Sequence, residues 1–297
     1  MIRRFAAWNE GEGVCRPQEG KVGWAVFPTE PLSETEAAVF ETFVVPRYLQ
    51  RFGEPVLEML LPTEGARIAH LGSRTGYLDR ELCQRVSRAT VYGVDGSPPA
   101  LELARNKAAT SQVAAQYLPG SSFPTTLPAA AFSHVIALHP IVDTEDRGAL
   151  FSEMARLLYQ GGQALISLPL RGSFQEIGDL FREYALKNDD GEFGRNMEEA
   201  MANRPTLEML SEELEVFGLE DVDVEIRQST LWFDNGRALI EDPVCRLLVF
   251  PEIKRSLGVT DLSAATSYLR EAVDKYWSEA RFELTVNVGC ASARRVA

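Results

Sequence analysis

A short turn near residue 70 has the residue types of a loop that binds a nucleotide-like ligand. In HLGSRTGYLD, residues 70–79, glycines stand at positions 72 and 76, after an apolar run and before an amphipathic stretch. Such a turn aims backbone N–H groups and the positive end of the next helix at a bound ligand. Asp95 closes the following apolar run, 19 residues after Gly76. A carboxylate at that spacing can accept hydrogen bonds from ribose hydroxyls.

Two common nucleotide loops do not match this turn. A GxGxxG loop needs glycines at 72, 74 and 77, but the chain has Gly72, Arg74 and Tyr77, which disfavours NAD. A Walker A loop ends in GK[ST], and the chain has GYL at 76–78. ATP binding by that route is therefore excluded.

Composition narrows the classes of partner. The 297 residues carry a formal net charge of -13, which disfavours nucleic-acid backbones and anionic membranes, so small molecules and proteins remain as partners. The four cysteines lack the spacing of a metal site or a disulfide framework. The first residues show no signal peptide and no apolar run is long enough to span a membrane. We expect a cytoplasmic protein without a metal.

The elements that must position the turn follow an alternating pattern. From residue 66, short apolar runs alternate with amphipathic stretches, which indicates βαβ units and a mainly parallel sheet. Strands are predicted at 66–72, 89–96, 114–120, 132–140, 163–170, 221–233 and 281–291, and helices at 77–87, 97–109, 145–162, 174–188, 206–219 and 262–277, with a helical stretch at 236–257.

Proline and glycine set several expected boundaries. Ser97 is predicted as a helix N-cap with Pro98 at the first helical position, and Gly161 and Gly162 are predicted to end a helix. Residues 34–61 favour two helices broken near Pro46 or Gly53. Residues 1–36 are interpreted as an irregular arm or lid, and 37–297 as one domain with a solvated connector at 189–204.

The pattern around the turn resembles a known family. With His70, Gly72, Arg74 and Gly76 in the keyed positions, the loop resembles the [DE]xGxGxG motif of class I S-adenosylmethionine-dependent methyltransferases. VYGVDGSPPALELARNKA and LFSEMARLLYQGGQALISLPL resemble two later segments of that family. The resemblance covers roughly residues 40–170. Within the family, the chain is most similar to the small-molecule, methyltransferase type 11-like branch. The resemblance implies an α/β fold: a Rossmann-like seven-stranded, mainly parallel sheet with helices on both faces and strand seven antiparallel.

The resemblance also implies a cofactor shell for S-adenosylmethionine. Gly72, Ser73 and Gly76 would line the methionine moiety, Asp95 would hold the ribose, and Gly96 and Ser97 would border the adenine. His70, Arg74, Ser121 and His139 complete the candidate shell. His139, after the fourth strand, is the candidate general base, although a histidine that merely ends a strand is the alternative. His134 is expected in the core.

Four positions depart from the family pattern. His70 replaces an acid, Arg74 replaces a glycine, Ser121 or Ser122 replaces an acid after strand three, and Ser133 replaces an aspartate. Arg74 either repels a sulfonium or binds the ligand's carboxylate. Charge-assisted contacts contribute about 1.5–3 kcal/mol each, so their loss would weaken binding. Two functions follow: methyl transfer to a small molecule, or a methyltransferase fold that has lost its cofactor and binds a protein partner.

Overall fold

The computed structural model describes residues 6–7, 16–17, 31–140 and 144–296. The expected arm at 1–36 therefore lies mostly outside the described residues. Within it, β1 (Ala6–Ala7) and β2 (Arg16–Pro17) pair in antiparallel fashion.

One seven-stranded sheet organises the chain. Its strands are β3 (Arg67–Leu71), β4 (Thr90–Asp95), β5 (Ala115–Pro119), β6 (Phe132–Leu138), β7 (Leu158–Pro169), β8 (Leu219–Phe233) and β9 (Phe282–Arg295). They lie in the order β5-β4-β3-β6-β7-β9-β8. The first five run parallel to one another, and β9 runs antiparallel to both of its neighbours, β7 and β8. The predicted sheet, with its last strand antiparallel, is confirmed.

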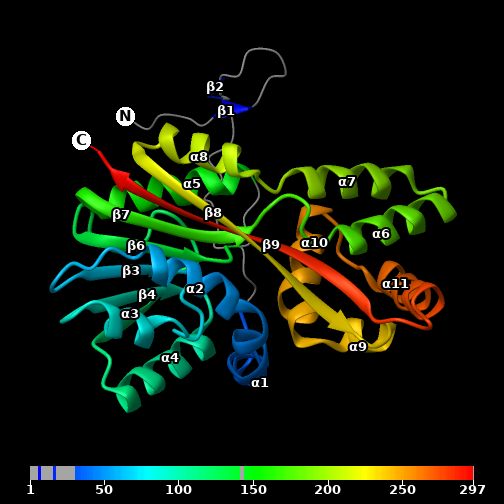
Figure 1. Ribbon diagram of the computed structural model, residues 1–297, viewed down its shortest axis with the longest axis horizontal. Helices are drawn as coiled ribbons and strands as arrows, with labels where there is room; N and C mark the ends of the chain where they lie inside the picture. Colours follow the sequence, from blue (N-terminus) through cyan, green and yellow to red (C-terminus); the bar gives the residue numbers. More distant parts are fainter. Residues whose placement is uncertain (1–5, 8–15, 18–30, 141–143, 297) are drawn as a thin grey trace.

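Helices cover both faces of this sheet, as Figure 1 shows. They are α1 (Glu34–Val39), η1 (Phe40–Leu49), α2 (Gln50–Met59), α3 (Asp79–Arg85), α4 (Pro98–Ser111), α5 (Thr144–Leu157) and α8 (Leu207–Val216). Leu150 of α5 and Leu210 of α8 share one core with the sheet. Val56 of α2 and Leu82 of α3 share a second core with it. Both faces of the parallel strands are thus buried, as is usual for a parallel sheet.

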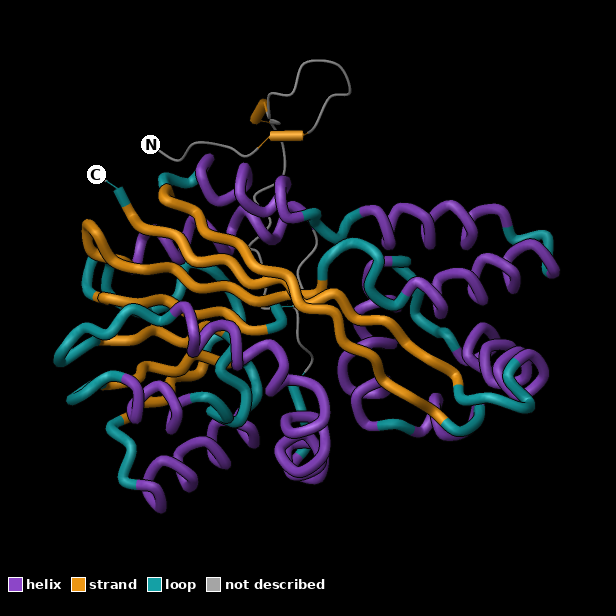
Figure 2. The backbone as a smooth tube through the Cα atoms, in the orientation of Figure 1, coloured by secondary structure: helices purple, strands orange, loops and turns teal. Residues whose placement is uncertain are grey.

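A helical lobe extends beyond the sheet on the far halves of β8 and β9 (Figures 1 and 2). It consists of α6 (Gln175–Lys187), α7 (Gly191–Ala202), α9 (Gly236–Glu241), η2 (Cys245–Val249), α10 (Phe250–Ser256) and α11 (Ser263–Tyr276). Side chains of η1 and α2, such as Tyr48 and Phe52, share the hydrophobic core of this lobe. The N-terminal helices therefore join the lobe to the sheet.

The predicted connector at 189–204 is wrong, because these residues form α7. The Asp190 side chain accepts a hydrogen bond from the Phe193 N–H and caps the helix. Phe193, Met197 and Met201 lie at helical spacing and are buried. The acidic residues between them, on the solvent face of the helix, make this segment look polar in the sequence and obscure its apolar face.

Two predicted breaks also differ from the structure. Helical geometry is continuous over residues 34–59, and Pro46 lies inside η1, where π-helical turns accommodate the missing N–H of proline. Helix α5 ends at Leu157, before the two glycines that were expected to end it. Gly161 has a φ of 78° and lies within β7.

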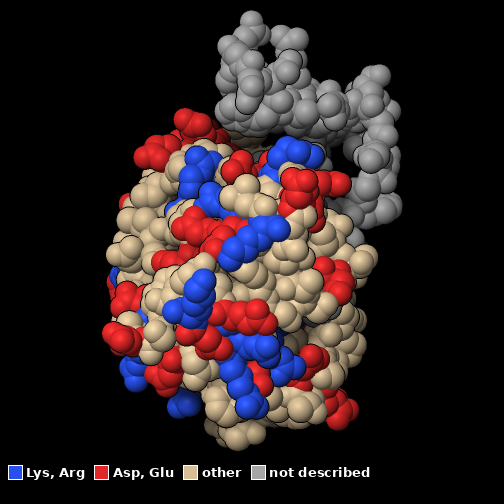
Figure 3. All heavy atoms as spheres, turned by 90° about the vertical axis from the view of Figure 1, so that its right-hand side faces the viewer, with Lys and Arg blue, Asp and Glu red and all other residues tan. Residues whose placement is uncertain are grey.

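The surface of the helical lobe mixes both signs of charge. Figure 3 shows Lys and Arg interspersed with Asp and Glu over this face. Among the described residues, no helix is both long and apolar enough to cross a membrane.

Candidate functional site

The glycine turn lies between β3 and α3 and is held against the end of β4. The N–H groups of Gly72 and Ser73 both donate to the Val94 carbonyl, at 2.9 and 3.1 Å. Gly72 and Gly76 have φ values of 67° and 61°, which glycine adopts without strain. A Cβ on Gly76 would lie 2.7 Å from the Tyr117 hydroxyl oxygen. Only glycine therefore fits that position.

A buried carboxylate supports the turn from below. Asp79, in the first turn of α3, accepts from His70 Nδ1 at 2.7 Å and from the Tyr117 hydroxyl at 2.7 Å. His70 and Asp79 are almost fully buried, and burial, followed by the charge of Asp79, raises the pKa of Tyr117. We call His70, Asp79 and Tyr117 the His70 corner. The acid that seemed absent at position 70 is supplied nine positions later, by the next helix.

Asp95 ends β4 as predicted, and its two oxygens already accept hydrogen bonds. Its Oδ2 accepts from the Arg74 backbone N–H at 3.0 Å and its Oδ1 from the Ser97 N–H at 2.8 Å. The Arg74 guanidinium lies 3.8 Å from Oδ1 and 5.8 Å from the centre of the Phe40 ring. Burial lowers the pKa of Arg74, and the charge of Asp95 opposes that shift. The sequence did not indicate this Arg74–Asp95 pairing.

Gly96, Ser97 and Ser121 come together beside Asp95. A Cβ on Gly96 would lie 3.3 Å from the Ser121 Cβ, so these two residues are in close contact. Ser97 is the N-cap residue of α4, but its side chain does not bond to that helix. Its hydroxyl accepts from the Leu32 N–H at 3.0 Å and donates to the Leu32 carbonyl at 3.2 Å. Leu32 is thereby fixed at the edge of the site.

His139 lies immediately after β6 in a buried, aromatic environment. Its Nε2 is 2.8 Å from the Tyr48 hydroxyl, and its ring meets that of Phe52 edge-on with centroids 4.9 Å apart. Burial lowers the pKa of His139 to about 4, and burial raises that of Tyr48 well above its usual value. The imidazole is therefore neutral at neutral pH. We call His139 and Tyr48 the His139 corner.

The other candidate positions have structural partners. His134, on β6, lies 2.8 Å from the Leu61 carbonyl through Nε2 and 2.9 Å from the Ser133 hydroxyl through Nδ1. The expectation that His134 belongs to the core is confirmed. Ser133 also donates to the Arg67 carbonyl at 3.0 Å. Neither residue joins the glycine turn.

Several buried polar atoms around the turn are left without a hydrogen-bond partner. Within the described part of the chain these atoms are His70 Nε2, Ser73 Oγ, Tyr77 OH and His139 Nδ1. Unsatisfied buried polar groups are costly and rare, so a group of them beside one loop is a sign of a bound ligand or water. The residues of the turn therefore fit a polar ligand at the carboxyl ends of β3 and β6.

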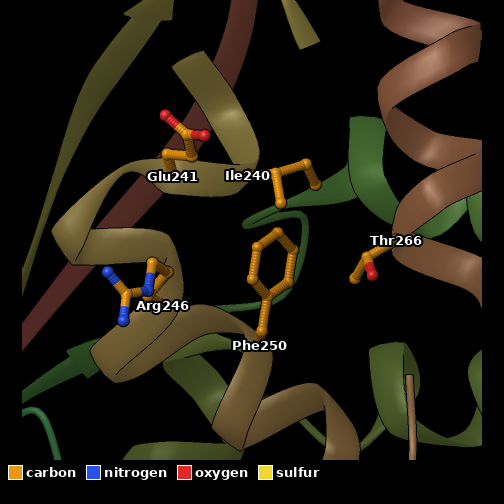
Figure 4. Close-up of a pocket in the computed structure, with 5 residues that line it drawn as sticks. All are labelled: Ile240, Glu241, Arg246, Phe250 and Thr266. Atoms are coloured by element: carbon orange, nitrogen blue, oxygen red, sulfur yellow. The ribbon is translucent and has the colours of Figure 1, made fainter. Parts of the chain in front are cut away.

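A separate pocket opens within the helical lobe (Figure 4). It is lined by Ile240, Glu241, Arg246, Phe250 and Thr266, which come from α9, η2, α10 and α11. None of its lining residues belongs to the predicted cofactor shell.

Sequence reasoning missed residues that complete both corners. Asp79 and Tyr117 lie beneath the turn, and Tyr48 reaches His139 from η1. Asp79, an acidic residue in the first turn of the helix after the glycine loop, could have been recognised in the sequence as a partner for His70. The contact between Tyr48 and His139 joins residues 91 positions apart, so no local sequence pattern predicts it.

Comparisons with known proteins bear on the same segment. Residues 68–162 match the family described as methyltransferase domain. The chain is 32% identical over 136 residues to malonyl-[acyl-carrier protein] O-methyltransferase of Serratia marcescens, covering 46% of this chain and 51% of that protein. It is 28% identical over 137 residues to demethylmenaquinone methyltransferase of Thermus thermophilus, covering 45% of this chain and 61% of that protein. The chain thus spans about half to three fifths of these relatives.

Solved structures share the fold. The YcgJ protein of Bacillus subtilis superposes with a TM-score of 0.55 at 13% identity, covering 84% of this chain and 99% of that one. Phosphoethanolamine N-methyltransferase 2 of Haemonchus contortus, in complex with S-adenosyl-L-methionine, gives a TM-score of 0.54 at 18% identity, covering 89% of this chain and 58% of that one. At these identities the likeness concerns the fold.

Proposed function

We propose that the chain transfers a methyl group from S-adenosylmethionine to a small-molecule acceptor. Its fold is that of the class I methyltransferases, and residues 68–162 match a methyltransferase domain, which supports the proposal. The single observation that carries the proposal is the position of Asp95. This carboxylate stands at the end of β4, within hydrogen-bonding distance of the glycine turn that follows β3. In sheets of this kind, ligands bind outside the carboxyl ends of the strands.

The residues of the turn fit the parts of the cofactor. We assign the methionine moiety to Gly72, Ser73 and Gly76, where the Ser73 hydroxyl, which has no partner within the described part of the chain, offers a hydrogen bond. We assign the ribose to Asp95, because a carboxylate has about four acceptor positions and can serve more than its two present donors. When bound, the cofactor supplies the electrophilic methyl group.

The adenine has a place beside the same strand end. We assign it to Gly96, Ser97 and Ser121, which lie together after β4 and β5. Leu32 reaches this edge through both of its hydrogen bonds to the Ser97 hydroxyl. Leu32 would therefore lie beside the adenine and help to exclude water.

The position of the Arg74 side chain conflicts with the assignment of the ribose to Asp95. Its guanidinium is buried beside Asp95, on the side where ribose hydroxyls would bind. Binding of the cofactor thus requires this side chain to move. Its neighbour Phe40, on η1, would be uncovered in the same step.

We assign His139 a positioning role and no role as a strong general base. A group with a pKa of about 4 holds a proton poorly at neutral pH, whereas an efficient general base has a pKa near the working pH. Catalysis would then depend on holding the acceptor in line with the methyl group in a site closed to water. The named relatives act on a malonyl-[acyl-carrier protein] and on demethylmenaquinone, which supports a small-molecule group as the acceptor.

Titration calorimetry with S-adenosylhomocysteine and, separately, S-adenosylmethionine tests the proposal. We expect saturable binding that Asp95→Asn weakens by about tenfold, the effect of losing one charge-assisted hydrogen bond. Asp223→Asn, on β8, is the matched control and should leave affinity unchanged. Absence of binding at millimolar ligand would overturn the proposal.

The pairing of Arg74 with Asp95 favours a second candidate function, a methyltransferase fold that binds a protein partner without the cofactor. Arg74→Gly separates the two. If the wild-type chain does not bind S-adenosylhomocysteine and the glycine variant does, Arg74 blocks the site and the second function is favoured. If the variant binds more weakly than the wild type, Arg74 contacts the ligand and the second function is excluded.

A further inference from the structure

A second group of buried polar side chains lies between the sheet and the helical lobe. It consists of Tyr48 in η1, His139 after β6, Arg204 after α7 and Glu252 in α10, which we call the interlobe cluster. The rings of Tyr48 and Phe52 contact His139, and the Arg204 guanidinium, which is bonded to Glu252, lies over the Phe174 ring. Because Tyr48, Phe52 and Phe174 belong to one hydrophobic core, the two pairs border the same core. Strands β3 and β6 are parallel neighbours with Leu71 opposite Ala137, so His139, just after β6, lies beside the glycine turn that follows β3.

The ion pair within this cluster is incomplete. Arg204 Nη2 donates to Glu252 Oε1 at 2.7 Å, but Arg204 Nε and Glu252 Oε2 are buried and lack partners among the described residues. Another pair, Arg147 with Glu213, shows the complete arrangement, in which Nε and Nη2 each donate at 2.8 Å to a different carboxylate oxygen. A buried arginine pair is normally made in this forked way. The interlobe pair thus keeps one donor and one acceptor free.

His139 supplies a third free position. Its Nε2 is bonded to the Tyr48 hydroxyl, and its Nδ1 is buried without a partner within the described residues. A neutral imidazole has one N–H, and when the Tyr48 hydroxyl donates to Nε2 that hydrogen lies on Nδ1. The cluster then offers two donors, at His139 and Arg204, and one acceptor, at Glu252.

This set of free atoms matches a hydroxyl group. A hydroxyl has one hydrogen to donate and two lone pairs that accept. The opposite charges of Arg204 and Glu252 cancel, so an added carboxylate or ammonium group would be buried next to one like charge. The cluster therefore favours an uncharged ligand.

Aromatic rings surround the polar atoms. The ring of Phe52 meets His139 edge-on, and the Arg204 guanidinium lies 4.9 Å from the centre of the Phe174 ring. Both phenylalanines are fully buried. Such surroundings suit a ligand whose hydroxyl is carried on an apolar or aromatic body.

We propose that the interlobe cluster is the binding site of the methyl acceptor, and that the acceptor is an uncharged molecule with a hydroxyl group on an aromatic or apolar body. This inference rests on the proposed methyl transfer. It places the acceptor at the carboxyl ends of β6 and β7, next to the turn assigned to the cofactor, with one wall from each lobe.

Nitrogen-15 spectra of the histidine rings test this site in the wild-type chain. The chain has 3 histidines, so each ring can be followed separately. The probes are benzyl alcohol, benzoate and benzylammonium, which share a ring and differ in charge. We expect benzyl alcohol to shift the His139 signals saturably, while benzoate and benzylammonium leave them in place. His134, at the other end of β6, is the internal control and should not move.

Matched variants connect the response to the ion pair. Glu252→Gln keeps the shape of the side chain and should weaken the benzyl alcohol response by about tenfold, whereas Glu213→Gln alters the completed pair and should leave it unchanged. A His139 signal that benzyl alcohol does not move, or that benzoate moves equally, would overturn the inference. An equal response in the two glutamine variants would overturn it as well.

Running each titration with and without S-adenosylhomocysteine separates this inference from the proposed function. Calorimetric binding of S-adenosylhomocysteine without any His139 response would retain the methyl transfer and reject the acceptor site. A benzyl alcohol response in a chain that does not bind S-adenosylhomocysteine would reject the methyl transfer and retain a hydroxyl-binding site.

Discussion

His70 and His139 lie at the same edge of the sheet in opposite chemical surroundings. His70, in β3, faces the carboxylate of Asp79, which also accepts from Tyr117. His139, after β6, faces a neutral tyrosine hydroxyl and two aromatic rings. Both imidazoles are buried and each keeps one nitrogen without a partner among the described residues.

The difference shows that the partner of a buried histidine decides its role. A carboxylate orients the imidazole and fixes a hydrogen on the nitrogen that faces it, so the His70 corner is a rigid support beneath the turn. An aromatic surrounding without a carboxylate contact disfavours the charged form, and the pKa of His139 falls to about 4. The His139 corner is therefore a neutral hydrogen-bonding surface.

Removing the carboxylate should have the largest effect. Asp79→Ala leaves both His70 and Tyr117 without their partner, and breaking such a buried pair costs about 4 kcal/mol of the free energy of unfolding. Denaturant titration measures the loss. Asp179→Ala, in an exposed pair with Arg182, is the control and should cost less than about 1 kcal/mol. Equal losses in the two variants would show that the His70 corner is no support.

Acid should lower the free energy of unfolding through protonation of His139 in the His139 corner. The pKa of His139 is about 4 in the folded chain and 6.5 is its ordinary value, so the unfolded chain binds the proton more readily. The stabilisation is complete above the unfolded pKa and is lost as the pH falls from there through the folded pKa. It amounts to about 3 kcal/mol. The free energy of unfolding of wild type and His139→Gln should converge over that pH range, and parallel curves would contradict the assignment.

Deleting the tyrosine hydroxyl at the His70 corner should cost less. Tyr117→Phe removes one donor from a buried carboxylate, which lowers the free energy of unfolding by about 2 kcal/mol because the acceptor is charged. Tyr276→Phe removes the same kind of contact at the surface, where Tyr276 donates to Glu183 at 2.6 Å. Thermal and denaturant unfolding should show little change for this control. The reverse order would remove the distinction between buried and exposed contacts.

The same deletion at the His139 corner should have the smallest effect. Tyr48→Phe breaks a hydrogen bond between two neutral groups, and such bonds contribute about 1 kcal/mol. Denaturant unfolding measures the cost, with Tyr159→Phe at the surface as the control. A loss as large as that of Tyr117→Phe would mean that the two corners do not differ in charge.

Local patterns in the sequence were sufficient to predict the individual strands and the turn, whereas the seven-stranded arrangement with an antiparallel last strand was implied by the resemblance to the methyltransferase family. The strands were visible because buried parallel strands are continuous apolar runs, and the turn was visible because Gly72 and Gly76 meet a conformational need that few other residues satisfy. Asp95 was found from its spacing alone. These signals all lie within single βαβ units.

Features that depend on distant residues were not predictable. The helical lobe is held by one core that joins η1, α6, α11 and the far ends of β8 and β9, and no short window shows that association. The sequence permits two roles for Arg74 because its partner Asp95 lies 21 positions away, outside any local pattern. The interlobe cluster unites residues from four separate segments, each of which looks ordinary in its own context.

The last strand has a consequence for how the chain acquires its structure during synthesis. Phe282, Leu284, Val286 and Val288 belong to the core of the helical lobe, and Ala291 and Ala293 belong to a core of the sheet. Strand β9 lies between β7 and β8 and pairs Gln163 with Arg294 across more than a hundred residues. Neither lobe can close its core on the ribosome until β9 has emerged. The two lobes must therefore remain incompletely folded, with apolar surface accessible to chaperones, until β9 has been made.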